Sequence, residues 1–230
     1  MTKAAGMVYV VDDDPGVREA MQDLLLSHGF DVATFSSAAG YKAALGSADG
    51  PACLLLDIEL PDMSGLELQS ELAGRLHPPI VFITGHGDIP SSVRAIKAGA
   101  VDYLPKPFTP EQLLAAIGVA LEQHRQMRGQ LQELAELKSR YATLTPRERE
   151  VLPLVVRGRL NKQAAADLDI SEVTLQIHRR NIMRKMDADS LPDLVRMSIK
   201  LEIDCTPGDS ETRAQVRSAA ADGRAGIDPT

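Results

Sequence analysis

The sequence predicts an α/β fold: a doubly wound parallel sheet of five strands, joined by a helical linker to a smaller all-α domain. Three observations support this prediction. Strand-like and helix-like segments alternate through the first 124 residues. Several of the strand-like segments are almost wholly apolar, as strands are when helices cover both faces of a sheet. After residue 124 the strand-like segments stop, and helical patterns continue to residue 203.

The five strands are short runs of β-favouring residues, each followed by a segment with helical periodicity. We expect the strands at 7–11, 31–35, 52–56, 80–84 and 101–104. We expect the helices between and after them at 15–28, 37–45, 64–75, 89–98 and 110–123. Two helix starts are clearly marked. Asp14 precedes Pro15 as an N-cap, and Thr109 and Gln112 have the spacing of a capping box.

A polar segment of strong helix formers follows at 123–141. Apolar residues recur near heptad spacing from Met127 to Tyr141, but Lys138 interrupts them. Both a short dimerising coiled coil and a solvated connecting helix therefore fit this segment. The predicted divisions of the chain are 1–124, a linker at 125–143, a helical domain at 144–203, and a disordered tail at 204–230 that is poor in large apolar side chains.

Composition and charge limit the classes of protein and partner. The chain has 230 residues and a net charge of −7, and no apolar run is long enough to span a bilayer. The N-terminal residues lack a signal-peptide pattern, and only Cys53 and Cys205 are available for a disulfide, so we expect a cytoplasmic protein without membrane contacts. Residues 1–124 contain seven basic and sixteen acidic side chains, so a surface for nucleic acid must lie further along the chain.

Acidic side chains follow two of the predicted strands. Asp12 and Asp13 end the first strand, and Asp57 ends the third. In the flavodoxin-like strand order 2-1-3-4-5, these two strands are neighbours, and ligands bind at this edge of the sheet. Carboxylates gathered there repel one another unless a cation intervenes, and Mg²⁺ is a hard ion that suits oxygen ligands. The alternative is that the acids cap helices and face water, which we expect for Asp14.

Two further polar residues are expected at the same edge, because Thr84 ends the fourth strand and Lys106 follows the fifth. A metal ion and an ammonium group can neutralise the oxygens of a phosphoryl group while a carboxylate attacks phosphorus. The set of polar groups is therefore typical of phosphoryl transfer onto a carboxylate.

Residues 7–124 resemble a response-regulator receiver domain, the CheY-like fold. The motifs that carry the resemblance are "VVDDD", "LLLDIELPDMSG", "FITGHGD" and "AGAVDYLPKPF". The resemblance implies that Asp57 accepts a phosphoryl group from a sensor histidine kinase or a small phosphodonor, and that Lys106 and Pro107 are joined by a cis peptide bond. It also implies that Mg²⁺ is held by Asp12, Asp13, Asp57 and the backbone carbonyl of Glu59, and that Thr84 and Lys106 stabilise the phosphoryl group. Tyr103 resembles the aromatic switch residue of this family. The alternative for Tyr103 is a half-buried aromatic residue of an edge strand.

The segment "GRLNKQAAADLDISEVTLQIHRRNIMRKM" indicates a helix, a short turn and a second helix, which is a helix-turn-helix pattern. We expect Asn161 and Ser171 to cap these two helices, with Ile170 in the core. Spacing places Leu175, His178, Ile182 and Met186 on the buried face of the second helix, and Val173, Gln176, Ile177, Arg180 and Arg184 on the exposed face. A cationic stripe can simply be solvated, but behind such a turn double-stranded DNA is favoured.

Residues 144–203 resemble a LuxR/NarL-type DNA-binding domain, closest to the FixJ type, through "LTPREREVL", "GRLNKQAAADLDIS", "VTLQIHRRNIMRKM" and "SLPDLVRM". Pro153, inside the first helix, and the small residues Ala164 and Ala165 depart from the pattern and should loosen the scaffold. The expected DNA-binding residues are Asn161, Lys162, Thr174, Gln176, Ile177, Arg179, Arg180 and Arg184.

These features predict a response regulator that is not an enzyme. Phosphorylation on Asp57 should lead the protein to dimerise on promoter DNA, with RNA polymerase as a further candidate partner. Two alternatives stay open. One is a regulator with a vestigial receiver that binds DNA without phosphate. The other is a phosphatase with an aspartate nucleophile, although Asp57-Ile58-Glu59 lacks the usual Asp-x-Asp pattern.

Overall fold

The structure is a computed structural model, and it describes residues 6–44, 50–74, 76–85 and 89–203. The chain divides into two compact units, Met1–Leu131 and Gln132–Thr230. The predicted disordered tail at 204–230 lies outside the described residues. Among the described helices, none has the length and apolar character that crossing a membrane requires.

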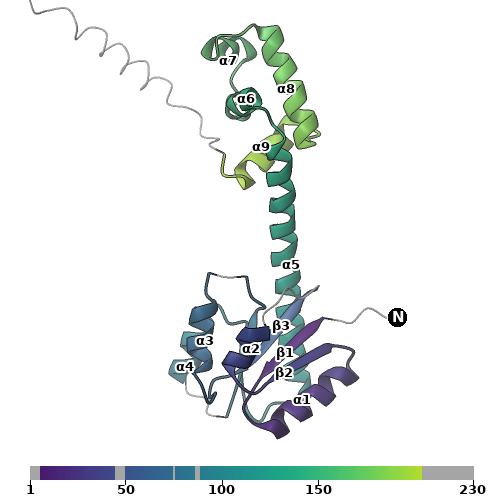
Figure 1. The fold of residues 1–230 in the computed structure, drawn as a ribbon, viewed down its shortest axis with the longest axis vertical. Coiled ribbons are helices and arrows are strands. Elements are labelled where there is room, and N and C mark those ends of the chain that lie inside the picture. The colour runs from purple at the N-terminus through teal and green to yellow at the C-terminus, as the bar shows by residue number, and fades with distance from the viewer. Residues whose placement is uncertain (1–5, 45–49, 75, 86–88, 204–230) are drawn as a thin grey trace, which may run out of the picture. The chain divides into compact units, whose positions relative to one another are not determined.

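The N-terminal unit contains a parallel sheet of five strands in the order β2-β1-β3-β4-β5. This confirms the predicted α/β fold and strand order. Figure 1 shows β1, β2 and β3 of this sheet side by side. The strands are β1 (Met7–Val11), β2 (Asp31–Phe35), β3 (Ala52–Asp57), β4 (Ile80–Thr84) and β5 (Asp102–Pro105). The last strand begins one residue later than predicted. Strands β3 and β4 are buried along their whole length, as expected for central strands covered on both faces.

Helices pack on both faces of the sheet, and each face has its own apolar core. The helices of this unit are α1 (Pro15–Ser27), α2 (Ala38–Ala44), α3 (Gly65–Leu72), α4 (Ile89–Lys97) and the first part of α5 (Pro110–Ala142), a helix that continues into the C-terminal unit. On one face, Leu25 of α1 and Ile117 of α5 pack with Leu55 of β3. On the other face, Leu68 of α3 and Ala95 of α4 join the apolar side chains of the sheet. The alternation of strand residues thus supplies both cores.

The helix caps of this unit match their sequence signals. Asp14 Oδ1 accepts hydrogen bonds from the backbone N–H groups of Gly16, at 2.7 Å, and Val17, at 3.3 Å. Thr109 and Gln112 form the reciprocal bonds of a capping box. Asp14 therefore begins a helix, as predicted.

Helix α5 continues without interruption from Pro110 to Ala142, so the linker whose continuity the sequence left open is helical. Two contacts fix it to the beginning of β3. His124 Nδ1 accepts the backbone N–H of Ala52 at 2.7 Å, and Arg128 donates to the carbonyl of Gly50 at 3.0 Å. The N-terminal unit thus contacts this helix as far as Arg128, five residues after Gln123, the predicted end of the receiver helix.

The C-terminal unit is helical around one core. Its helices are α6 (Pro146–Val156), α7 (Asn161–Asp167), α8 (Glu172–Met186) and α9 (Leu191–Lys200). Leu152, Leu175, Ile182 and Leu194 are fully buried. Helix α6 continues through Pro153, and the small residues Ala164 and Ala165 of α7 are themselves part of the core.

The turn between α7 and α8 follows the prediction, but the start of α7 does not. Asp169 has a φ of 54°, and Ser171 caps α8 by accepting the N–H of Thr174. The prediction that Asn161 caps α7 is wrong. Leu160 occupies the N-cap position with an extended backbone and without a side-chain capping bond, so Asn161 is already inside the first turn. The Asn161 side chain is free of the capping role that the sequence indicated.

Candidate functional site

Three carboxylates gather at the carboxyl end of the sheet, where β1 and β3 lie side by side. Val11 pairs with Leu56, so Asp12 and Asp57 leave the sheet next to each other. One oxygen from each of Asp12, Asp13 and Asp57 lies within 4.8 Å of the others. Asp12 is fully buried and Asp57 is 6% exposed, whereas Asp13 is open to solvent. The parallel register therefore creates the predicted acidic cluster, which is open to solvent at Asp13.

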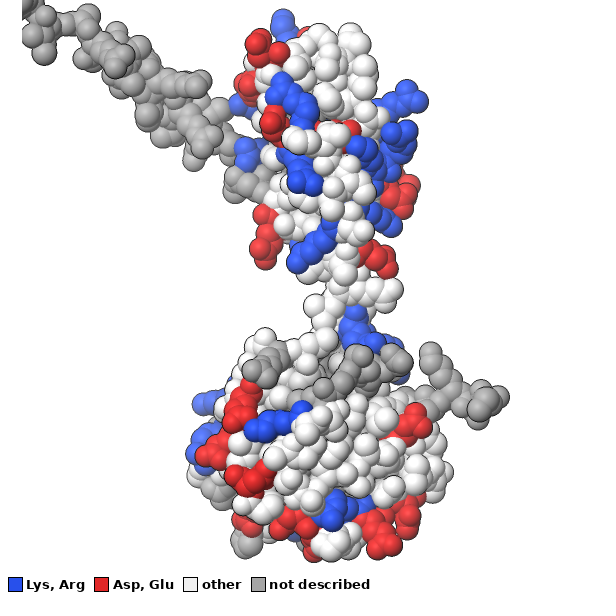
Figure 2. Space-filling view, viewed as in Figure 1, with Lys and Arg blue, Asp and Glu red and all other residues white. Residues whose placement is uncertain are grey.

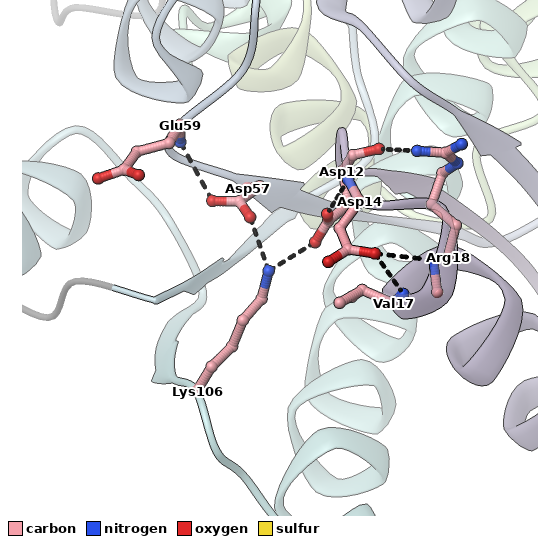
Figure 3. A network of polar contacts seen from close by, with 8 residues as sticks. Asp12, Asp14, Val17, Arg18, Asp57, Glu59 and Lys106 are labelled. Atoms are coloured by element: carbon pink, nitrogen blue, oxygen red, sulfur yellow. Dashed lines mark hydrogen bonds and ion pairs between the residues drawn. The ribbon is translucent and has the colours of Figure 1, made fainter.

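Lys106 lies between two of these carboxylates (Figure 3). Its Nζ atom is 2.7 Å from Asp12 Oδ2 and 2.7 Å from Asp57 Oδ2. Burial alone would lower the pKa of Lys106, but the hydrogen bonds to both carboxylates outweigh it and raise this pKa. Burial raises the pKa of Asp12, and Lys106 opposes that shift. The ammonium group stays charged and neutralises part of the cluster.

The backbone around Asp57 holds its carboxylate in place. Asp57 Oδ1 accepts the N–H of Glu59 at 3.1 Å, as Figure 3 shows. Gly65, at the start of α3, packs against the same residue, because a Cβ atom added there would lie 2.3 Å from the Asp57 carbonyl oxygen. The Gly65 N–H also donates to the carbonyl of Ile58 at 2.9 Å. The close approach of α3 therefore requires a residue without a side chain at position 65.

One neighbour of the cluster was missed by the sequence reasoning. The Arg18 guanidinium donates to the backbone carbonyl of Asp12 at 2.7 Å (Figure 3). Arg18 lies one helical turn after the Asp14 cap, so an arginine in the first turn of α1 was the available signal. Its bond holds the backbone that carries Asp12.

The remaining predicted residues of the acidic site lie on β4 and β5. Thr84 ends β4 and is 1% exposed, and its carbonyl accepts the N–H of Lys106 at 2.7 Å. Tyr103 is half-buried on β5 with its ring centre 6.5 Å from that of Phe82. The peptide bond between Lys106 and Pro107 is cis, as the resemblance implied. The sheet thus brings Thr84 and Lys106 to the edge that holds the carboxylates.

A second candidate site lies on α8 of the C-terminal unit. Leu175, Ile182 and Met186 are buried and His178 is half-buried, which agrees with the predicted inner face. The outer face is exposed and consists of Val173, Gln176, Ile177, Arg180 and Arg184. Figure 2 shows Lys and Arg side chains along the side of this unit where α8 lies, and acidic ones on the visible face of the N-terminal unit. The exposed Arg180 and Arg184 therefore give this face of α8 a positive charge, in the part of the chain where the sequence predicted a basic surface.

The other predicted DNA-binding residues differ in their surroundings. Lys162 is exposed. Thr174 bonds to the Ser171 hydroxyl, with 2.8 Å between the two side-chain oxygens. Arg179 is half-buried, and its guanidinium donates to Asn161 Oδ1 at 2.6 Å. This bond between α8 and α7 was also missed by the sequence reasoning, which treated both residues as separate DNA contacts.

The sequence matches two family models, one for each unit. Residues 8–118 match the response regulator receiver domain, and residues 142–198 match the bacterial regulatory proteins of the luxR family. Response regulator protein TodT from Pseudomonas putida is 48% identical over 206 residues, which are 88% of this chain and 89% of TodT. Transcriptional regulatory protein FixJ from Rhizobium meliloti is 42% identical over 193 residues, or 84% of this chain and 94% of FixJ.

A solved structure is similar to most of this chain. The structure of the response regulator StyR is similar to this chain with a TM-score of 0.75 and 45% sequence identity, over 86% of this chain and 100% of the StyR chain. The similarity therefore extends over both units, each of which has the fold described above.

Proposed function

Because this chain belongs to the response regulators that join a receiver domain to a LuxR-family DNA-binding domain, we propose that phosphorylation of Asp57 controls its binding to promoter DNA. The observation that carries the proposal is the contact of Lys106 with Asp57 beside the acidic cluster. In this proposal the receiver is 1–124, the linker 125–143 and the DNA-binding domain 144–203, in a cytoplasmic protein.

The proposed reaction is transfer of a phosphoryl group from a phosphohistidine of a sensor kinase. A carboxylate oxygen of Asp57 forms a bond to phosphorus, the bond between phosphorus and the histidine nitrogen breaks, and the nitrogen keeps the electron pair. The N–H of Glu59 and the ammonium of Lys106 hold the Asp57 carboxylate in one orientation before the reaction. The buried Thr84 hydroxyl is the neighbouring donor proposed to bind a phosphoryl oxygen.

The acidic cluster fits a hard divalent cation, because its side-chain ligands are carboxylate oxygens and its charge exceeds what Lys106 neutralises. We propose that Asp12, Asp13, Asp57 and the Glu59 carbonyl hold Mg²⁺, which when bound would offset the negative charge of the phosphoryl group. Asp13 gives the ion access from solvent, since it is the exposed member of the three carboxylates.

The response to phosphorylation is proposed to start from Thr84 and Tyr103. Drawing Thr84 toward a phosphoryl group would open space that the half-buried Tyr103 ring can enter. The receiver surface changes as a result, the protein dimerises, and α8 helices of two copies bind paired half-sites in double-stranded DNA. RNA polymerase is then a candidate partner at the promoter.

On the DNA face, the exposed side chains of α8 are proposed to contact base edges. Gln176 can pair with adenine, Ile177 can contact a thymine methyl group, and Arg180 can pair with guanine. Arg184 and Lys162 are proposed to bind phosphates. The buried face of the same helix holds these groups on a rigid support.

The central experiment compares wild-type protein with Asp57→Asn and with Asp23→Asn, a control that changes an exposed aspartate on α1. Each is incubated with acetyl phosphate and Mg²⁺, and incorporated phosphate and affinity for promoter DNA are measured. We expect incorporation and tighter binding in wild type and Asp23→Asn, and neither in Asp57→Asn. Incorporation by Asp57→Asn would refute the acceptor. If the wild-type protein binds promoter DNA equally well with and without acetyl phosphate, the phosphate-independent regulator is favoured. If the protein steadily hydrolyses phosphate esters, the phosphatase is favoured.

A further inference from the structure

The bond between Arg179 and Asn161 joins the two helices of the helix-turn-helix. Arg179 lies on α8, Asn161 is the first residue of α7, and the guanidinium donates to Asn161 Oδ1 at 2.6 Å. The two residues are 18 positions apart, so this is a tertiary contact and not one within a helix.

Arg179 differs from the other arginines of the same helix. Arg180 and Arg184 are exposed, whereas Arg179 is half-buried. Its position, three residues after Gln176, places it at the border of the exposed stripe, on the side that contacts α7. Its guanidinium is thus directed to another part of the protein.

The chemistry of the two groups determines how the Asn161 amide is oriented. A guanidinium has only hydrogen-bond donors, so the amide must turn its oxygen toward Arg179. The amide nitrogen, with two N–H groups, then points away from the arginine. Among the residues that the structure describes, this is the one hydrogen bond of the Asn161 side chain, and Asn161 has no capping role because Leu160 is the N-cap.

We propose that Arg179 is a positioning residue for DNA binding, which acts by turning the N–H groups of Asn161 toward a DNA phosphate and does not itself contact DNA. Amide side chains are common donors to phosphate oxygens, and such contacts set the register of a protein on the duplex. This inference rests on the proposed function, because it assigns a division of roles within the DNA surface.

The substitution Asn161→Asp separates positioning from mere structural support. An aspartate would bind Arg179 more strongly through a charge-assisted bond, but it would lose both N–H donors and bring a negative charge toward the phosphate. We expect the variant to unfold at a temperature no lower than that of the wild type, and to bind DNA about tenfold or more weakly. Wild-type affinity in Asn161→Asp would overturn the proposal.

A double-mutant cycle tests whether Arg179 acts through Asn161. The full chain is measured as wild type, Arg179→Met, Asn161→Ala and the double variant, using a duplex recovered by the wild-type protein from a random-sequence pool. If Arg179 acts through Asn161, its substitution weakens binding in the wild-type background and has little further effect beside Asn161→Ala. Additive effects would overturn the proposal.

The salt dependence of binding provides a second readout. When a contact between an arginine and a phosphate is lost, the negative slope of log affinity against log salt concentration becomes shallower by about 0.9. We expect Asn161→Ala and the double variant to have the same slope, because Arg179 makes no phosphate contact of its own. A difference of about 0.9 between them would show that Arg179 contacts DNA directly. Arg196→Met, which removes an exposed arginine of α9, is the matched control for charge.

Two further variants distinguish failure of this inference from failure of the proposed function. Gln176→Ala and Arg180→Ala remove side chains proposed to contact bases, and they are measured on the same duplex. If neither weakens binding, α8 is not the DNA-binding helix and the proposed function fails. If both weaken binding while Arg179 and Asn161 act additively, only the positioning role fails.

Discussion

The Lys106 ammonium nitrogen lies 2.7 Å from a carboxylate oxygen of Asp57, although the two residues are 49 positions apart in the sequence. The same nitrogen lies 2.7 Å from Asp12. Asp12 and Asp57, the two carboxylates that the lysine contacts, also belong to the proposed metal site, so the ammonium group would compete there with a bound divalent cation. Its bond to Asp57 also places a positive charge where a phosphoryl group would be bound.

Replacement of Lys106 should separate metal binding from phosphoryl transfer. In Lys106→Met we expect Mg²⁺ to bind more tightly, on the order of tenfold, because the competing cation is gone. Phosphorylation by acetyl phosphate should nevertheless slow, because the ammonium group beside Asp57 is missing. Calorimetry measures the first effect and phosphate incorporation the second. Lys42→Met, which removes a surface lysine paired with Glu71, should change neither.

The neighbouring acids Asp13 and Asp14 should respond differently to the same substitution. Asp13→Asn removes a charged ligand from the cluster, so we expect Mg²⁺ affinity to fall about tenfold or more. Asp14→Asn should leave Mg²⁺ affinity unchanged, because Asp14 caps α1 and asparagine is an equally good cap. Titration of both variants with Mg²⁺ measures the two affinities. Equal losses of Mg²⁺ affinity would contradict the assignment of Asp13 to the cation site and of Asp14 to the helix cap.

His124 should make the stability of the N-terminal unit depend on pH. Burial, with the charge of Arg128 and the neighbouring His77, lowers the pKa of His124 below 6.5, and its Nδ1 must stay unprotonated to accept the Ala52 N–H. A depressed pKa means that the folded state binds fewer protons than the unfolded state. The contribution of His124 to the free energy of unfolding is therefore complete above pH 6.5. It is lost as the pH falls below 6.5, by up to about 1.4 kcal/mol per pH unit.

Urea unfolding across this pH range provides the measurement. In His124→Asn, whose amide oxygen can accept the same N–H, we expect the part of the pH dependence just below pH 6.5 to disappear. His28→Asn, which alters an exposed histidine at the end of α1, should keep the wild-type profile. An unchanged profile in His124→Asn would show that other groups cause the dependence.

Glu148 should be important for the stability of the C-terminal unit. It is 3% exposed, caps α6 with Thr145, and lies 2.7 Å from the Lys185 ammonium on α8. Burial would raise the pKa of Glu148, but the bonds to Lys185 and Thr145 outweigh it and lower this pKa. Glu148→Gln keeps an acceptor for the cap and loses the ion pair, so we expect a loss of about 1–3 kcal/mol.

The helical circular dichroism signal during urea unfolding measures this loss. Glu150→Gln is the matched control, because Glu150 is an exposed acid of the same helix and pairs with Arg147 at the surface. We expect it to change stability by less than about 1 kcal/mol. If the two variants are equally stable, the buried pair contributes no more than a surface pair.

The acidic site could be predicted because it depends on topology. Parallel strands deliver the residues at their carboxyl ends to one edge, so Asp12, Asp57 and Thr84 were placed together from their positions alone. The exposed and buried faces of α8 were predicted for a similar reason, since the helical period orders its residues. The roles of single residues within these sites stay predictions.

The contacts missed from the sequence are those that depend on where long side chains reach. Arg18 bonds to a backbone carbonyl, and Arg179 bonds to a residue on another helix. Neither contact joins two residues at the regular spacing of one helix or strand. The spacing of residues in the sequence therefore could not identify the partner of either arginine. The error at Asn161 has a related cause: the helix starts one position earlier, after an apolar N-cap whose residue type gives no capping signal.

Gly65 has a consequence for any attempt to transplant the receiver chemistry onto another scaffold. Such a graft would ordinarily copy the functional groups: the three aspartates, the threonine and the lysine. Those groups would not suffice, because α3 begins against the carbonyl of Asp57 and leaves no room for even a methyl group at position 65. The new scaffold would therefore need a glycine at the position of Gly65 as well as an aspartate at the position of Asp57.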